Sequence, residues 1–235
     1  MTVTAQDFEQ VYARFQAPIS RRYDCGKKCA PLNKGIPVCC DQERAVPVVD
    51  GGEWELLKSR TDLWRIYTPK NKTEEREFGG LAEGCQSIVC KGVKFCERDN
   101  RTIACRAFPF FPYFTADKEL VGLGYYWGFE GLCWVISNLT IVEKPFIDEM
   151  IAASEFIFAR DADELATYIT FSATMRGVFT KWNRKIPLLL RDGKLAWVLP
   201  GSGGKIVPAA ESDIPTTLAP FAGDRGAEGA TKEAA

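Results

Sequence analysis

Nine cysteines and no histidine are the feature that most constrains how this chain of 235 residues can fold. An odd number of cysteines argues against a disulfide framework, and a start without a secretory signal leads us to expect the reducing cytoplasm. Reduced thiols gathered in loops are typical of metal ligands rather than of core residues. Eight of the nine form two groups: Cys25, Cys29, Cys39 and Cys40, then Cys85, Cys90, Cys96 and Cys105.

The missing histidine excludes Ser-His and Cys-His catalysis and every metal site that uses an imidazole. Lys and Arg number 30 and Asp and Glu number 31, so no overall positive field attracts nucleic acid or an anionic membrane. No apolar run approaches the roughly 20 residues that a membrane-spanning helix needs. We therefore expect no nucleic acid and no membrane as partners, which leaves a protein as the candidate partner.

Apolar spacing and capping residues predict an α+β fold. A first amphipathic helix is expected after Thr4, and Pro145 and Asp161 are each placed to begin a later helix. Two apolar runs around Asp192-Gly193 predict a β-hairpin. Between them the cysteine segments carry many glycines, prolines and polar residues, and we expect them to be irregular loops.

The domain organisation follows from these elements. We expect residues 1–200 to form a single metal-binding domain, with a cysteine-cluster core at about 23–114 and a helical and hairpin part at about 143–200. Residues 201–235 are rich in small residues, prolines and charges, and are predicted to be a disordered tail. Cys133 lies among apolar residues and is predicted to be a buried structural thiol.

The cysteine spacings fit none of the common short metal motifs. They read Cys25-x3-Cys29-x9-Cys39-Cys40 and Cys85-x4-Cys90-x5-Cys96-x8-Cys105, so the two-residue gap of a zinc knuckle is absent. A radical-SAM triad would need its third cysteine at Leu32, and a plant-type ferredoxin would need one at Val93.

The arrangement is similar to another family. "DCGKKC", then "CC" followed by Glu53, and then "FCERDNRTIACRAFPF" resemble the YkgJ-like CxxCxxCC cysteine-cluster family over about residues 23–114. Members are described as zinc- or iron-chelating proteins, without a general activity. Thr102 stands where the family has proline, and the first motif is more loosely spaced. The positions that fill the family's second motif are Cys96, Arg101, Cys105, Arg106, Phe108 and Pro109.

The resemblance and the thiol chemistry together predict a metal centre. Most ligands are expected among Cys25, Cys29, Cys39, Cys40, Cys96 and Cys105, with Cys85 or Cys90 completing the set, so residues 25–40 and 85–105 must meet in space. Around the anionic centre, Arg101 and Arg106 are expected to supply positive charge and Phe108 to exclude water.

The sequence favours an iron–sulfur cluster, because zinc knuckles are missing and because arginines and aromatics adjoin the cysteines. Its expected role is electron transfer or metal-dependent maturation of another protein. Two alternatives stay open: a zinc-stapled interaction module, and a cluster-containing modifying enzyme such as a protein methylase, the latter only by analogy. The sequence leaves open whether the protein is an enzyme.

Overall fold

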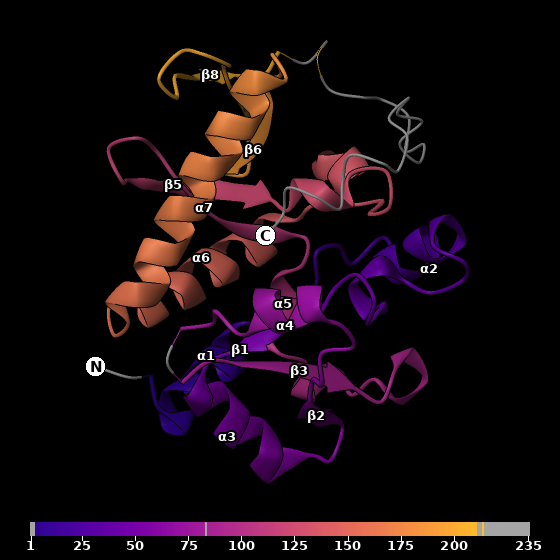
Figure 1. Ribbon diagram of the computed structural model, residues 1–235. Helices are drawn as coiled ribbons and strands as arrows, with labels where there is room; N and C mark the ends of the chain where they lie inside the picture. Colours follow the sequence, from indigo (N-terminus) through magenta and orange to yellow (C-terminus); the bar gives the residue numbers. More distant parts are fainter. Residues whose placement is uncertain (1–2, 83, 211–212, 214–235) are drawn as a thin grey trace.

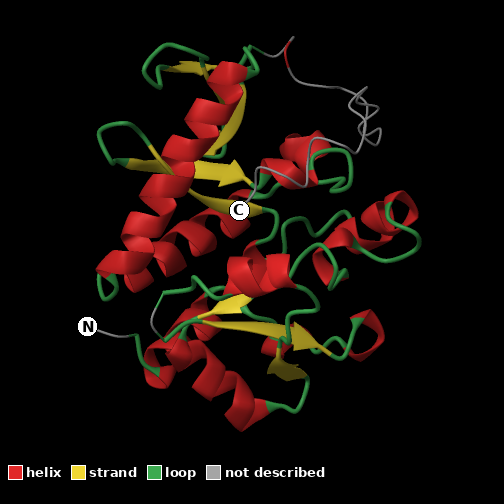
Figure 2. Cartoon of the chain, in the orientation of Figure 1, coloured by secondary structure: helices red, strands yellow, loops and turns green. Residues whose placement is uncertain are grey.

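The computed structural model describes residues 3–82, 84–210 and 213, which fold into helices and two sheets (Figures 1 and 2). Helices account for 45% of the structure and strands for 16%, and the strand pairs are antiparallel. The predicted α+β class is therefore confirmed. None of the described helices is long and apolar enough to cross a membrane.

The N-terminal part combines two helices with a small sheet. Helix α1 (Ala5–Arg14) begins at the capping box predicted at Thr4, whose hydroxyl accepts from the Asp7 N–H at 3.2 Å. Helix α3 (Gly51–Arg60) is capped by Asp50 and packs against α1. The sheet has the order β1-β3-β2, formed by Val48–Val49, Gln86–Cys90 and Trp64–Ile66.

Gly52 in the first turn of α3 explains how closely the N-terminal segment can approach. A Cβ at this position would lie 2.2 Å from the carbonyl oxygen of Val3, a contact that no side chain tolerates. Glycine therefore lets α3 lie directly against the chain that leads into α1. The apolar side chains of α1, α3 and β3 form a small core there.

The larger core lies between helices α6 (Lys144–Phe158) and α7 (Ala162–Lys181) and a five-stranded sheet. In Figure 1 the two helices run across this sheet, and α7 packs on its first strand through the Ser172 hydroxyl, which accepts from the Phe114 N–H at 3.0 Å. The strand order is β4-β5-β6-β7-β8, formed by Phe110–Phe114, Leu120–Tyr125, Ile186–Leu190, Leu195–Val198 and Ile206–Pro208.

The predicted hairpin and helix starts agree with the structure. Strands β6 and β7 pair around Asp192-Gly193, α6 begins with Pro145 in its first turn, and Asp161 caps α7. The predicted start of the disordered tail at residue 201 is wrong, because Ile206–Pro208 adds an edge strand to the sheet. Residues 211–212 and 214–235 of that predicted tail lie outside the described residues.

The cysteine segments are more regular than predicted. In the first group, α2 (Cys25–Cys29) and the 3₁₀ turns η1 (Ala30–Leu32) and η2 (Val38–Cys40) replace the expected loop. The second group is not one irregular segment either, because β3 ends at Cys90 and Cys105 lies in helix α5 (Ile103–Ala107). The remaining short elements are α4 (Lys72–Phe78), η3 (Val93–Phe95), η4 (Arg98–Asn100), η5 (Trp127–Phe129) and η6 (Ile136–Ile141).

Candidate metal centre

The two cysteine segments meet in space, as the sequence predicts. Cys39 and Cys40 from η2, Cys90 from the end of β3 and Cys105 from α5 line one small pocket. Trp64 and Val89 are among the apolar residues of its wall. A strand, a helix and a 3₁₀ turn that are far apart in the sequence therefore bring their thiols to one place.

The sulfurs of the neighbouring residues Cys39 and Cys40 lie close together. The two Sγ atoms lie 3.9 Å apart. Sulfurs that share a tetrahedral metal at ~2.3 Å lie ~3.8 Å from each other, so this pair already has the spacing of neighbouring ligands. A hydrogen bond from Cys39 lowers the pKa of Cys40 to about 7, because it stabilises the thiolate.

Arg101 brings a positive charge beside these thiols. Its Nε donates to the Cys96 Sγ at 3.1 Å, and its guanidinium also interacts electrostatically with Cys105 and Cys39. The same positive charge acts to lower the pKa of the Cys25 and Cys40 thiols. Five cysteines thus interact with one guanidinium group, and Cys90 joins them because it lines the pocket and lies near Cys40 and Cys96. We call these residues the six-cysteine group: Cys25, Cys39, Cys40, Cys90, Cys96 and Cys105.

Partial burial keeps the thiols of Cys25 and Cys105 protonated when no cation is bound. It raises the pKa of Cys105 to about 12, with a further contribution from the charges of Cys40 and Cys90. Burial likewise raises the pKa of Cys25 to about 11, and Cys29 adds to the shift. A metal ion that binds these sulfurs must displace their protons, so metal binding is expected to release protons and to tighten as the pH rises.

Two predicted ligands lie in other surroundings. Cys29 is buried and turns toward Cys133, with which it shares a thiol hydrogen bond, and its Sγ also accepts from the Trp134 N–H at 3.2 Å. Cys133 is 3% exposed, in agreement with its predicted role as a buried thiol. Cys85 is close to the carboxylates of Asp50, Asp161 and Glu164, so Cys90 and not Cys85 belongs to the six-cysteine group.

Arg106 and Phe108 also differ from the prediction. Arg106 lies over the Tyr12 ring at 4.4 Å and donates to the Phe15, Asp99 and Arg101 carbonyls at 2.7, 2.7 and 3.1 Å. It therefore joins α5 to α1 and does not face the thiols. Phe108 packs against Tyr126 and Phe129 in the larger core.

Glu53 anchors the helix that carries Cys105. The side chain is 3% exposed, and its Oε1 accepts from the Tyr12 hydroxyl at 2.7 Å and from the Ile103 N–H at 2.6 Å. Ile103 is the first residue of α5, and the Thr102 hydroxyl accepts from the Cys105 N–H at 2.9 Å. A helix of five residues does not form alone, so these contacts fix the position of Cys105.

The role of Glu53 was not predicted, although a signal for its burial exists in the sequence. Glu53 precedes Leu56 by three residues and Leu57 by four, so it lies on the same buried face of α3. Gln42, whose Nε2 donates to the Cys90 carbonyl at 2.7 Å, has no such signal, because only the tertiary fold brings it to β3.

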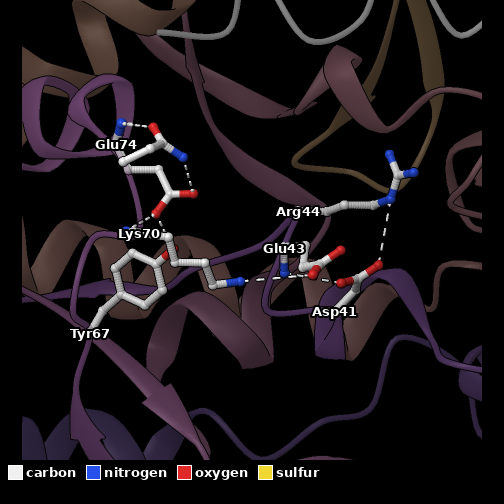
Figure 3. A network of polar contacts seen from close by, with 7 residues as sticks. Asp41, Glu43, Arg44, Tyr67, Lys70 and Glu74 are labelled. Carbon is white, nitrogen blue, oxygen red and sulfur yellow. Dashed lines mark hydrogen bonds and ion pairs between the residues drawn. The ribbon is translucent and has the colours of Figure 1, made fainter.

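A polar network holds the segment that follows Cys40 (Figure 3). Asp41 accepts from the Asn33 amide at 2.9 Å and pairs with Arg44 at 3.5 Å. Next along the chain, Glu43 pairs with Lys70 at 3.8 Å, and the Lys70 N–H donates to Glu74 at 2.7 Å. The Cys39-Cys40 turn is therefore tied to the residues that lead into α4.

The chemistry of the six thiols suits an all-thiolate centre, but their sulfurs do not surround a single position. Among the described residues, no three Cys, Asp or Glu side chains are already placed to hold one metal ion together. A polynuclear cluster attaches its thiolates to different metal atoms, so it needs no three sulfurs around a single ion. No family model, curated protein or solved structure matches this chain.

The carboxylates near Cys85 predict a pH dependence. Burial, together with the charges of Asp161 and Asp50, raises the pKa of Glu164 to about 7. Glu164 therefore holds a proton in the folded state that the unfolded chain releases near pH 4.5, so its contribution to stability is full below that pH and disappears as the pH rises through about 7. In urea unfolding, the free energy of unfolding should therefore fall as the pH rises from 5 to 8. Glu164→Gln should lose this part of the fall, whereas Asp163→Asn, at an exposed position of the same turn, should keep it.

Proposed function

We propose that this protein holds an iron–sulfur cluster through the six-cysteine group and serves in electron transfer or in metal-dependent maturation of another protein. The observation that carries the proposal is the convergence of thiols from two distant segments: four of them line one pocket, and five interact with the guanidinium of Arg101. Thiolates are soft ligands that iron–sulfur clusters and zinc both accept. The resemblance to the YkgJ-like family supports a metal centre at the same cysteines.

Arg101 favours a redox cluster over a structural zinc site. A cluster with thiolate ligands is anionic and becomes more negative on reduction, so a half-buried guanidinium beside it stabilises the reduced state more than the oxidised state. The apolar wall of Trp64 and Val89 limits the access of water to the same thiols. All nine cysteines are free, which fits the reducing cytoplasm that we propose as the location.

The alternatives receive less support from the site. A zinc staple needs four thiolates around one ion, and no three thiols among the described residues are placed to hold one ion together. A modifying enzyme needs room for a substrate, but the pocket lined by the thiols has a volume of about 20 Å³, enough for about one water molecule. We therefore place electron transfer or maturation first.

Anaerobic purification with metal and sulfide analysis tests the proposal. We expect a brown protein that contains iron and acid-labile sulfide, with a visible charge-transfer absorption that bleaches on reduction. A colourless protein with stoichiometric zinc and no iron would make the zinc-stapled module the leading function instead.

Arg101 and Arg106 should respond differently to substitution. Arg101→Ala removes the charge beside the thiols and should lower the reduction potential, because the more negative reduced state loses more stabilisation. Arg106→Ala should instead lower the free energy of unfolding, by about 2 kcal/mol, because it leaves buried carbonyls without their donor. Redox titration and urea unfolding of both variants separate the two roles, and an unchanged potential in Arg101→Ala would contradict the assignment.

A further inference from the structure

The surface beside the six-cysteine group is strongly basic although the chain as a whole is not. We define the cysteine face as residues 21–36 and 91–101, two segments that lie on the same side of the molecule in Figure 1, around α2 and beyond the end of β3. These segments contain nine basic and three acidic residues, whereas the chain has 30 and 31. Positive charge is therefore concentrated where the thiols approach the surface.

Exposed apolar side chains lie within this basic surface. Phe95, which directly precedes Cys96, is 61% exposed, and Val93 and Ile36 are 43% and 42% exposed. A phenylalanine this open to water costs hydrophobic free energy that a covering partner would recover. Three of the six large apolar side chains exposed in the described residues thus lie on the cysteine face.

Some of the charges here are available to a partner. Lys27 and Lys91 pair with Asp24 and Asp62, but Lys94 and Arg98 form no ion pair within residues 3–82, 84–210 and 213. Lys94 and Arg98 lie on either side of Phe95 and Cys96 in the sequence, and both are exposed. An apolar contact bordered by unpaired positive charge is complementary to an acidic protein surface.

We propose that the cysteine face docks a small acidic redox protein, which exchanges one electron with the cluster. This inference rests on the proposed function. One electron leaves the reduced partner, which is oxidised, and enters the cluster, which is reduced, and no covalent bond forms or breaks. The exposed apolar group is small, so the complex belongs with the weak, transient interfaces that bury less than about 1,200 Å². Compact apolar side chains beside the thiols favour a protein over nucleic acid as the occupant.

Equilibrium binding to a plant-type [2Fe–2S] ferredoxin, a small acidic redox protein, tests the docking face. The full chain, prepared anaerobically, should bind the ferredoxin with an affinity that falls as salt is added, and should not bind cytochrome c, a basic redox protein of similar size. The double substitution Lys94→Glu and Phe95→Ser should weaken the binding by about tenfold or more.

The matched control is another lysine followed by an exposed aromatic residue. Lys181 and Trp182, at the C-terminal end of α7, are exposed but lie outside the cysteine face, so Lys181→Glu with Trp182→Ser should change the affinity by less than about twofold. Equal effects of the two double variants, or absence of ferredoxin binding, would overturn the proposal. The proposal would also be overturned if the protein bound a DNA oligonucleotide and not the ferredoxin, and if the Lys94→Glu and Phe95→Ser variant bound that DNA more weakly.

The outcomes for the docking face and for the proposed function can be told apart. Metal analysis of the same sample decides the function, while the binding assay needs no electron transfer. If the protein contains iron but does not bind the ferredoxin, the docking face alone is overturned. An iron-free protein that binds it overturns the electron exchange together with the proposed function.

Discussion

Glu53→Ala should lower the free energy of unfolding by about 3 kcal/mol and reduce the metal content of the purified protein. The substitution leaves the Tyr12 hydroxyl and the Ile103 N–H without their acceptor in a buried place, and each unpaired group costs ~1–3 kcal/mol. It also releases the start of α5, so Cys105 loses its fixed position. Urea unfolding and metal analysis measure the two effects.

Glu53→Gln is the informative control for this prediction. Burial raises the pKa of Glu53 to about 7, and glutamine resembles the protonated form and keeps an oxygen that can accept both hydrogen bonds. We expect this variant to retain the metal and most of the stability. Glu55→Ala, on the exposed side of the same helix, should change neither property. A normal metal content in Glu53→Ala would show that Glu53 does not position Cys105.

Cys105→Ala should remove most of the metal and lower the free energy of unfolding by several kcal/mol. Cys105 is half-buried at the meeting point of η2, β3 and α5, so in the proposed centre its sulfur links the two cysteine segments. Metal binding and local folding are coupled, and such coupling reaches ~10–16 kcal/mol in small zinc domains. Hydrogen exchange should show that residues 25–40 and 90–105 both become less protected.

Cys85→Ala provides the matched control for Cys105→Ala. Its thiol lies near the carboxylates of Asp50, Asp161 and Glu164 and not in the six-cysteine group. We expect this variant to keep the full metal content and the protection of both cysteine segments. If the two alanine variants lost equal amounts of metal, the assignment of Cys90 in place of Cys85 would be wrong.

Local signals in the sequence predict the elements whose cause is local. The capping box at Thr4, the cap at Asp161 and the turn at Asp192-Gly193 act within a few residues, and the structure confirms each of them. The meeting of the two cysteine groups is also predicted from the sequence, because ligands of one metal centre must lie close together in space.

Other parts of the site depend on distant contacts that a local pattern does not contain. Helix α5 has five residues and needs Glu53 at its start and Arg106 on the Tyr12 ring near its end. The sequence places Arg106 in a family motif beside Cys105, but only the fold turns its guanidinium toward α1. For the same reason spacing alone does not choose between Cys85, which directly precedes β3, and Cys90, which ends it.

X-ray absorption at the iron edge of the anaerobically purified protein tests the central claim most directly. The six-cysteine group predicts iron surrounded by sulfur alone, together with scattering from a second iron atom nearby, and Cys105→Ala should lose most of this signal. A protein that shows no iron edge, and instead a zinc edge with four sulfur neighbours, would contradict the iron–sulfur centre.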